Sequence, residues 1–192
     1  MEKGKEKKMH VKGSSILAVP AFVKTKYPDR YDEWVNSLSP EAKSIQTDAI
    51  LATNLYPLYY AMVEPTQKLC DLFYNGGTRG AWESGKFSAS FAQKGIYKFF
   101  FKVGSPQFII ERAARVFTSY YPEGELQVTE SEPNRVVLQI VKFPEPYRIL
   151  DYDIAGWIDG TLELLKCAQG KVEITQSMAE GDPVTEFVAT WI

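Results

Sequence analysis

Histidine, the side chain that most often serves as a general base or metal ligand in enzymes, occurs only once in this chain of 192 residues, at His10. It lies in a lysine-rich stretch ahead of the first apolar run, and we expect residues 1–12 to form a disordered leader. The two cysteines, Cys70 and Cys167, are far apart and follow no CxxC or related metal-ligand spacing. The sequence therefore predicts no metal centre, no histidine-based catalysis and no enzyme activity.

Paired carboxylates are a second kind of residue that could do chemistry, because one can act as an acid while the other acts as a base. Asp151 and Asp153 are two positions apart in an expected helix, so their side chains point to different sides. We therefore interpret these two aspartates as solvated helix charges rather than as a catalytic pair.

Two arginines, Arg112 and Arg115, lie on an expected helix that begins at Ser105. They could hold a carboxylate or phosphate through forked hydrogen bonds. The alternative is a surface face on which they pair with Glu111.

Aromatic side chains make up 14% of the chain, with 11 Tyr, 11 Phe and 4 Trp. Aromatics at this density either fill a core or line a cavity. A cavity with aromatic walls and a few phenol hydroxyls would suit a flat or elongated apolar ligand. We predict these ligand-binding residues: Tyr56, Tyr59, Tyr60, Tyr97, Phe101, Phe108 and Arg112.

The elements that must position these residues change in character near Gly124. Before it, apolar spacing predicts helices, and the expected spans are 16–23, 31–38, a helix starting at Pro40, 58–74, 81–93, 96–103 and 107–120. After it, the pattern predicts strands at 126–129 and 136–143, a helix at 149–168, and strands at 171–177 and 184–191. This order of hairpin, helix and hairpin predicts an α+β fold, in which N-terminal helices pack with a four-stranded antiparallel sheet. We expect a single domain over residues 13–192.

Charge and composition limit the classes of binding partner and the cellular compartment that we expect. A net charge of −2 and a pI near 5.6 argue against nucleic acid as the main partner. No window approaches the ~18 apolar residues of a membrane-spanning helix. With two cysteines and no export signal, we expect the cytoplasm as the compartment.

Three stretches carry a resemblance to a known superfamily. They are residues 55–59, residues 96–121 with the Gly-Ser-Pro run at 104–106, and residues 143–191 with Phe-Pro-Glu-Pro at 143–146, Ala-Gly-Trp at 155–157 and Gly-Asp-Pro at 181–183. In their order and spacing the chain resembles the superfamily that joins haem-NO-binding (H-NOX) domains, 4-vinyl-reductase-like small-molecule-binding domains and TRAPP vesicle-tethering subunits. The resemblance implies a cytoplasmic domain that forms homodimers and encloses a ligand pocket between its helices and sheet.

The chain also departs from this superfamily. Ser177 and Thr185 stand where the 4-vinyl-reductase-like members carry cysteines, so we expect no thiol site there. H-NOX proteins hold haem by a histidine about two turns before a Tyr-Pro pair, and counting back from Tyr121 and Pro122 places that position near Ala114. We therefore expect neither haem held in the H-NOX manner nor another cofactor.

Two functional hypotheses follow. The first is a non-enzymatic sensor that binds a small, largely apolar molecule and acts through a homodimer. The second is a protein-interaction or scaffold module of the TRAPP type, without a ligand.

Overall fold

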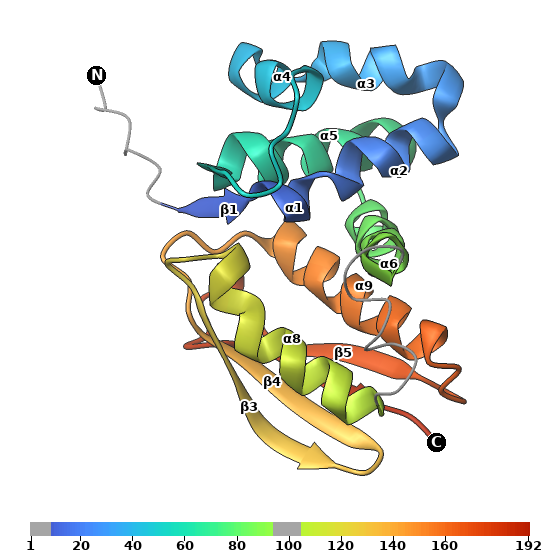
Figure 1. The fold of residues 1–192 in the computed structure, drawn as a ribbon, viewed down its shortest axis with the longest axis vertical. Coiled ribbons are helices and arrows are strands. Elements are labelled where there is room, and N and C mark those ends of the chain that lie inside the picture. The colour runs from blue at the N-terminus through green and yellow to red at the C-terminus, as the bar shows by residue number, and fades with distance from the viewer. Residues whose placement is uncertain (1–8, 94–104) are drawn as a thin grey trace.

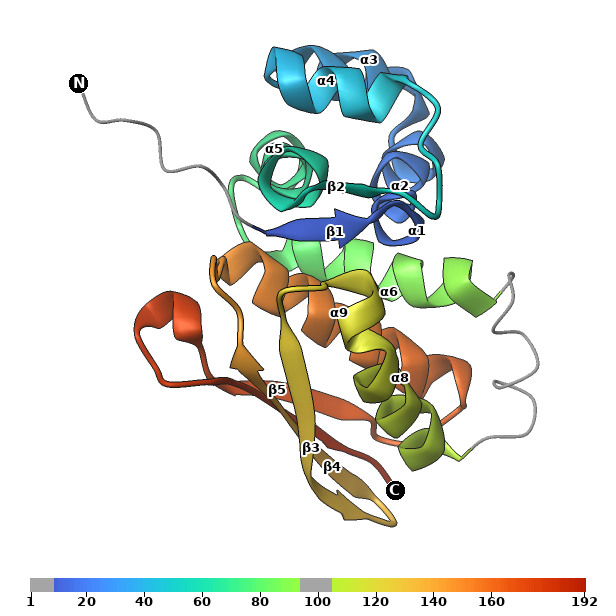
Figure 2. The ribbon, with the colours of Figure 1, turned by 60° about the vertical axis from the view of Figure 1, so that its left-hand side comes forward.

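The structure is a computed structural model that describes residues 9–93 and 105–192. Its elements form layers: a group of N-terminal helices, then helices α6 and α9, then a β-sheet that carries helix α8 (Figures 1 and 2). The α+β prediction is confirmed, with the second half of the chain built as hairpin, helix and hairpin.

The N-terminal layer consists of short helices around one long-range strand pair. Its elements in chain order are β1 (His10–Lys12), α1 (Gly13–Ile16), α2 (Ala18–Lys26), α3 (Tyr31–Ser37), α4 (Pro40–Thr47), β2 (Leu55–Pro57), a π-helical turn (Tyr59–Val63) and α5 (Glu64–Phe73). One buried acid, Glu64, organises the start of α4 by accepting hydrogen bonds from the backbone N–H and the hydroxyl of Ser39 at 2.6 and 2.8 Å. The Ser39 oxygen in turn caps α4 by accepting the Ala42 N–H.

The remaining elements build the sheet and the helices that cover it. They are α6 (Arg79–Gln93), α8 (Pro106–Tyr120), β3 (Glu125–Glu132), β4 (Arg135–Lys142), α9 (Arg148–Leu164), β5 (Lys171–Gln176) and β6 (Thr185–Thr190). The four strands are antiparallel in the order β3-β4-β6-β5. Helix α8 packs on β3 and β4 while α9 packs on β5 and β6, so the two helices cover one face of the sheet.

Helices α6 and α9 cross at backbone distance because glycines face the partner helix. A Cβ atom added to Gly156 would lie 2.1 Å from the carbonyl oxygen of Trp82, and one added to Gly85 would lie 1.9 Å from the carbonyl oxygen of Asp153. Only glycine permits backbones to approach this closely. The crossing joins the N-terminal layer to the sheet layer.

Several boundaries differ from the sequence-based expectations. The expected leader is wrong for residues 9–12, since Met9 is fully buried and His10–Lys12 pair with β2. The long helix expected over 58–74 is divided into the π-helical turn and α5. The helix expected at 96–103 lies outside the described residues. The β1–β2 pair was missed because each strand has only three residues, too few to show an alternating pattern.

Candidate functional site between helix α8 and strand β3

Helix α8 supplies one wall of the site. It begins after Ser105, whose side chain accepts the Phe108 N–H at 3.2 Å, and it has a proline at its first position. Ile110, Ala114 and Phe117 are buried along the face that packs on the sheet layer. Helix α8 is therefore fixed at its start by a cap and along its length by an apolar stripe.

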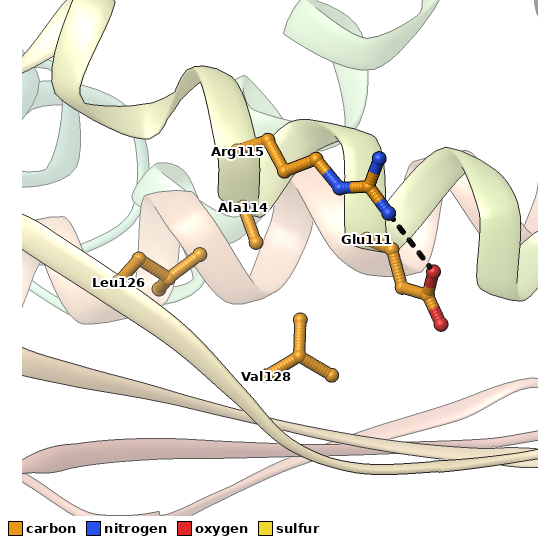
Figure 3. A pocket seen from close by; sticks show the side chains of 5 residues that line it. All are labelled: Glu111, Ala114, Arg115, Leu126 and Val128. Atoms are coloured by element: carbon orange, nitrogen blue, oxygen red, sulfur yellow. Dashed lines mark ion pairs between the residues drawn. The ribbon is translucent and has the colours of Figure 1, made fainter.

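A hollow of about 250 Å³ lies between α8 and β3, lined by Glu111, Ala114, Arg115, Leu126 and Val128 (Figure 3). We call it the α8–β3 hollow. Leu126 and Val128 are two apart on β3, so their side chains share the face that meets the helix. Opposite them Ala114 offers only a methyl group, and this short side chain leaves the space open.

The charged groups on the rim of this hollow are already paired. The guanidinium of Arg115 lies 3.8 Å from the Glu111 carboxylate (Figure 3), which also accepts a hydrogen bond from the Ser131 hydroxyl at 2.7 Å. Arg115 is 75% exposed, so this ion pair is screened by water. The alternative in which Arg115 pairs with Glu111 on the surface is thus confirmed. An apolar floor with a satisfied polar rim suits binding of an apolar molecule.

The predicted ligand-binding residues lie in several places, and none of those described is among the five that line the hollow. Tyr56 lies on β2, where its hydroxyl accepts the Leu51 N–H at 2.9 Å. Tyr59 and Tyr60 are on the π-helical turn with their ring centroids 5.3 Å apart, and Tyr59 lies 5.9 Å from Tyr147.

The other predicted residues are on or before α8. Phe108 is 44% exposed and Arg112 is also exposed on the helix surface, while Tyr97 and Phe101 lie outside the described residues. Sequence reasoning weighed Arg115 but missed Ala114, Leu126 and Val128. The signal available was weak: two apolar residues alternating on β3 opposite a small residue on α8.

The two aspartates expected to be solvated are instead buried, so that expectation is wrong. Asp151 is 4% exposed, and its carboxylate accepts a hydrogen bond from the Ser177 hydroxyl at 2.5 Å. Burial raises the pKa of Asp151, and the bond from Ser177 opposes that rise. Asp153 is 6% exposed, and its Oδ1 has no partner among the described residues. Burial raises the pKa of Asp153 to about 7.

Cys70 is the more deeply buried of the two cysteines. Its side chain is fully buried, and burial raises the pKa of the thiol to about 11. A thiol with so high a pKa carries almost no thiolate at neutral pH. Cys167 is only partly buried, and burial raises its pKa as well.

No protein-family model matches this sequence, and no curated protein matches it. Solved structures do. An H-NOX protein from S. oneidensis with NO on Fe(II) aligns with a TM-score of 0.72 at 11% identity, covering 94% of this chain and 99% of that one. An Fe(II) unliganded H-NOX protein from K. algicida aligns with a TM-score of 0.67 at 12% identity, covering 94% and 96%. The chain has the H-NOX fold.

The five residues that line the α8–β3 hollow include no histidine, cysteine, methionine or tyrosine, which are the side chains that ligate haem iron in proteins. The position near Ala114, where the resemblance places the haem histidine, carries a methyl group on the hollow's floor. The chain's one histidine, His10, lies on β1, where its ring Nδ1 is 2.9 Å from Glu123 and its backbone N–H donates to the same carboxylate at 3.0 Å. The hollow's volume of about 250 Å³ is below the ~300–1,000 Å³ typical of ligand pockets.

Among the described residues, no helix is both long enough and apolar enough to cross a membrane.

Proposed function

We propose that this protein is a non-enzymatic cytoplasmic sensor domain that binds a small, largely apolar molecule in the α8–β3 hollow and does so without haem. One observation carries the proposal. At the place where the H-NOX resemblance puts the haem histidine, this chain has Ala114, and its methyl group forms the floor of an apolar hollow whose polar rim is already paired.

The ligand that suits this hollow is small and has little need for hydrogen bonds. Ala114, Leu126 and Val128 offer apolar surface, and burying apolar surface stabilises a complex by about 25 cal/mol per Å². Because Glu111 and Ser131 already bond to each other, a strongly polar ligand would have to displace that contact. Arg115 lies at the exposed edge, where it can meet a single negative charge on the ligand.

Binding at α8 has a physical route to the N-terminal layer. The turn after α8 holds Glu123, whose carboxylate accepts hydrogen bonds from the ring and the backbone N–H of His10 on β1. On the same turn Tyr121 packs against Phe117 and Phe143, with ring centroids 4.9 and 5.6 Å away. A ligand that shifts α8 would therefore bear on both contacts, and strand β1 is the element we propose to respond.

The test uses toluene and benzoate as probes, followed by the backbone amide signals of the full chain in nuclear magnetic resonance spectra. We expect saturable shifts of the amides of α8 and β3, with smaller shifts on β1 through the contact between Glu123 and His10. Ala114→Leu fills the hollow and should weaken both probes at least fivefold. Thr118→Leu, the same added side chain at an exposed position of α8, is the matched control and should leave binding unchanged. Absence of shifts at millimolar probe, or equal binding by the Ala114→Leu variant, would contradict the proposal.

Haem is tested separately by adding hemin to the purified protein and recording its absorption spectrum. We expect no saturable one-to-one complex with the Soret band of ligated haem. A complex that His10→Ala abolishes would contradict the haem-free part of the proposal and assign the iron to His10.

The homodimer belongs to the same proposal, and the scaffold module of the TRAPP type is its alternative. Sedimentation of the protein with and without benzoate separates them. A sensor dimer should change its association or shape when the probe binds. A scaffold should form a stable complex that the probe leaves unaffected.

A further inference from the structure

A second hollow, of about 340 Å³, lies in the N-terminal layer and is separate from the α8–β3 hollow. Helix α2 contributes Pro20, Ala21 and Lys24, α3 contributes Tyr31, and α4 contributes Gln46. Asp48 and Ile50, which follow α4, close the other side. We call it the α2–α4 hollow. Its volume falls within the ~300–1,000 Å³ of small-molecule sites.

Two opposite charges face this hollow without neutralising each other. Lys24 holds its ammonium group 4.6 Å from the centre of the Tyr31 ring, a cation–π contact that keeps it at the rim. Asp48 accepts a hydrogen bond from the Ser44 hydroxyl at 3.0 Å. In the part of the chain that the structure describes, neither charge has a partner of opposite sign within 4.0 Å.

A buried amide in the wall lacks half of its hydrogen bonding. Gln46 is only 5% exposed, and its Nε2 donates to the carbonyl oxygen of Ala61 at 2.8 Å. That bond fixes the amide against the π-helical turn. Its Oε1 is buried and has no partner among the described residues. An unpaired buried acceptor is costly. Because protein atoms cover this oxygen, a molecule in the hollow meets the apolar lining and the two charges, not the amide oxygen.

The residues around the α2–α4 hollow are complementary to a molecule with three features. A carboxylate would pair with Lys24, an ammonium group would donate to Asp48, and an apolar tail would pack on Pro20, Ala21 and Ile50. We propose that the α2–α4 hollow binds a hydrophobic α-amino acid in its zwitterionic form. The site is distinct from the α8–β3 hollow, so either proposal can fail while the other stands.

The experiment is calorimetric titration of the full chain with L-leucine. Two analogues each lack one charge: 3-methylbutylamine has no carboxylate and 4-methylpentanoate has no ammonium group. We expect one leucine per chain and at least tenfold weaker binding of both analogues, because each loses a charge-assisted hydrogen bond. No saturable binding below about 10 mM, roughly the weakest affinity of interest, would overturn the proposal. So would an analogue that binds as well as leucine.

Surface variants locate the site without risk to the fold. Lys24→Gln and Asp48→Asn both change exposed side chains, and each should weaken leucine about tenfold. The matched controls are Lys26→Gln, two positions further along α2, and Asp29→Asn, and neither residue lines the hollow. Both controls should bind leucine like the parent. Equal affinity in the Lys24 and Asp48 variants would show that leucine binds elsewhere and would overturn the assignment.

Discussion

Helix α9 meets α6 at backbone distance, whereas helix α8 meets strand β3 across a gap. At the first contact Gly85 and Gly156 bring the two backbones together, so no side chain separates them. At the second contact the facing groups are the methyl of Ala114 and the apolar side chains of β3, and the space between them stays open. We call the α6–α9 crossing the closed contact and the packing of α8 on β3 the open contact.

The polar groups in these two regions behave differently as a consequence. Asp153, at the closed contact, is buried with an unpaired oxygen. Glu111, at the open contact, is paired with Arg115 and Ser131. The closed region should therefore control stability and its dependence on pH, whereas the open region should tolerate change and control binding.

The largest expected effect comes from Asp153→Asn at the closed contact. Burial raises the pKa of Asp153 to about 7, well above that of an unfolded aspartate. Between these two pKa values the unfolded chain releases a proton that the folded chain keeps, so this group lowers stability as pH rises from about 4 to 7. At about 1.4 kcal/mol per unit, the total loss is on the order of 4 kcal/mol, and the asparagine variant avoids it.

Urea unfolding of parent and variant from pH 4 to 8 measures this difference. The free energy of unfolding of the variant, relative to that of the parent, should increase as pH rises. Asp159→Asn is the control on the same helix, because the Asp159 carboxylate accepts the Trp82 indole N–H at 2.9 Å and pairs with Lys86 at 3.1 Å. That variant should be less stable than the parent at neutral pH. A stability difference for Asp153→Asn that does not change with pH would contradict the buried, unpaired carboxyl.

The second effect compares one added carbon at the closed contact with three at the open one. Gly156→Ala places a Cβ 2.1 Å from the Trp82 carbonyl oxygen, so the helices must separate. We expect a loss of about 3 kcal/mol. Ala114→Leu adds more atoms but fills the α8–β3 hollow, and should change stability by less than about 1 kcal/mol. Thermal unfolding measures both, and a Gly156→Ala variant as stable as the parent would contradict the close crossing.

The difference between the closed and the open contact also explains which parts of the fold could be predicted from the sequence. Hairpin, helix and hairpin were visible because the strands alternate and turn residues separate them, as at Pro133 and Pro183. The closed contact between α6 and α9 could not be predicted from the sequence. Gly85 and Gly156 indicate only weakened helices when the position of the partner backbone is unknown. For the same reason Asp151 and Asp153 read as surface charges: burial depends on what α9 packs against, which no local spacing reveals.

The candidate sites were harder still to predict from sequence. The predicted aromatic set rested on residue type, whereas the α8–β3 hollow arises from the short side chain of Ala114 meeting Leu126 and Val128 from a different element. A hollow forms where side chains from segments that are far apart in the sequence do not fill the space between them. Composition therefore indicated the kind of ligand better than the place where it would bind.

The third effect concerns Glu123, whose contribution to stability should depend on pH in the opposite direction to that of Asp153. Burial would raise the pKa of Glu123, but the hydrogen bonds from the ring and backbone N–H of His10 outweigh it and lower that pKa. The stabilisation is thus present at neutral pH and is lost as pH falls through the lowered pKa. Solvent screens this half-exposed contact, so Glu123→Gln should cost only about 1 kcal/mol at pH 7 and almost nothing near pH 3. Chemical unfolding at both pH values checks it; a larger cost at the lower pH would contradict the contact.

The smallest effect tests whether the open region controls binding rather than stability. Glu111→Gln removes the carboxylate that pairs with Arg115 at the rim. An exposed ion pair of this kind is worth about 0.3–0.5 kcal/mol, so stability should hardly change. The freed guanidinium can then meet the carboxylate of benzoate, and we expect benzoate to bind about twofold tighter while toluene, which has no charge, binds as before. If both probes change equally, the rim acts through the shape of the hollow and not through its charge, and the contrast with Asp153 would rest on packing alone.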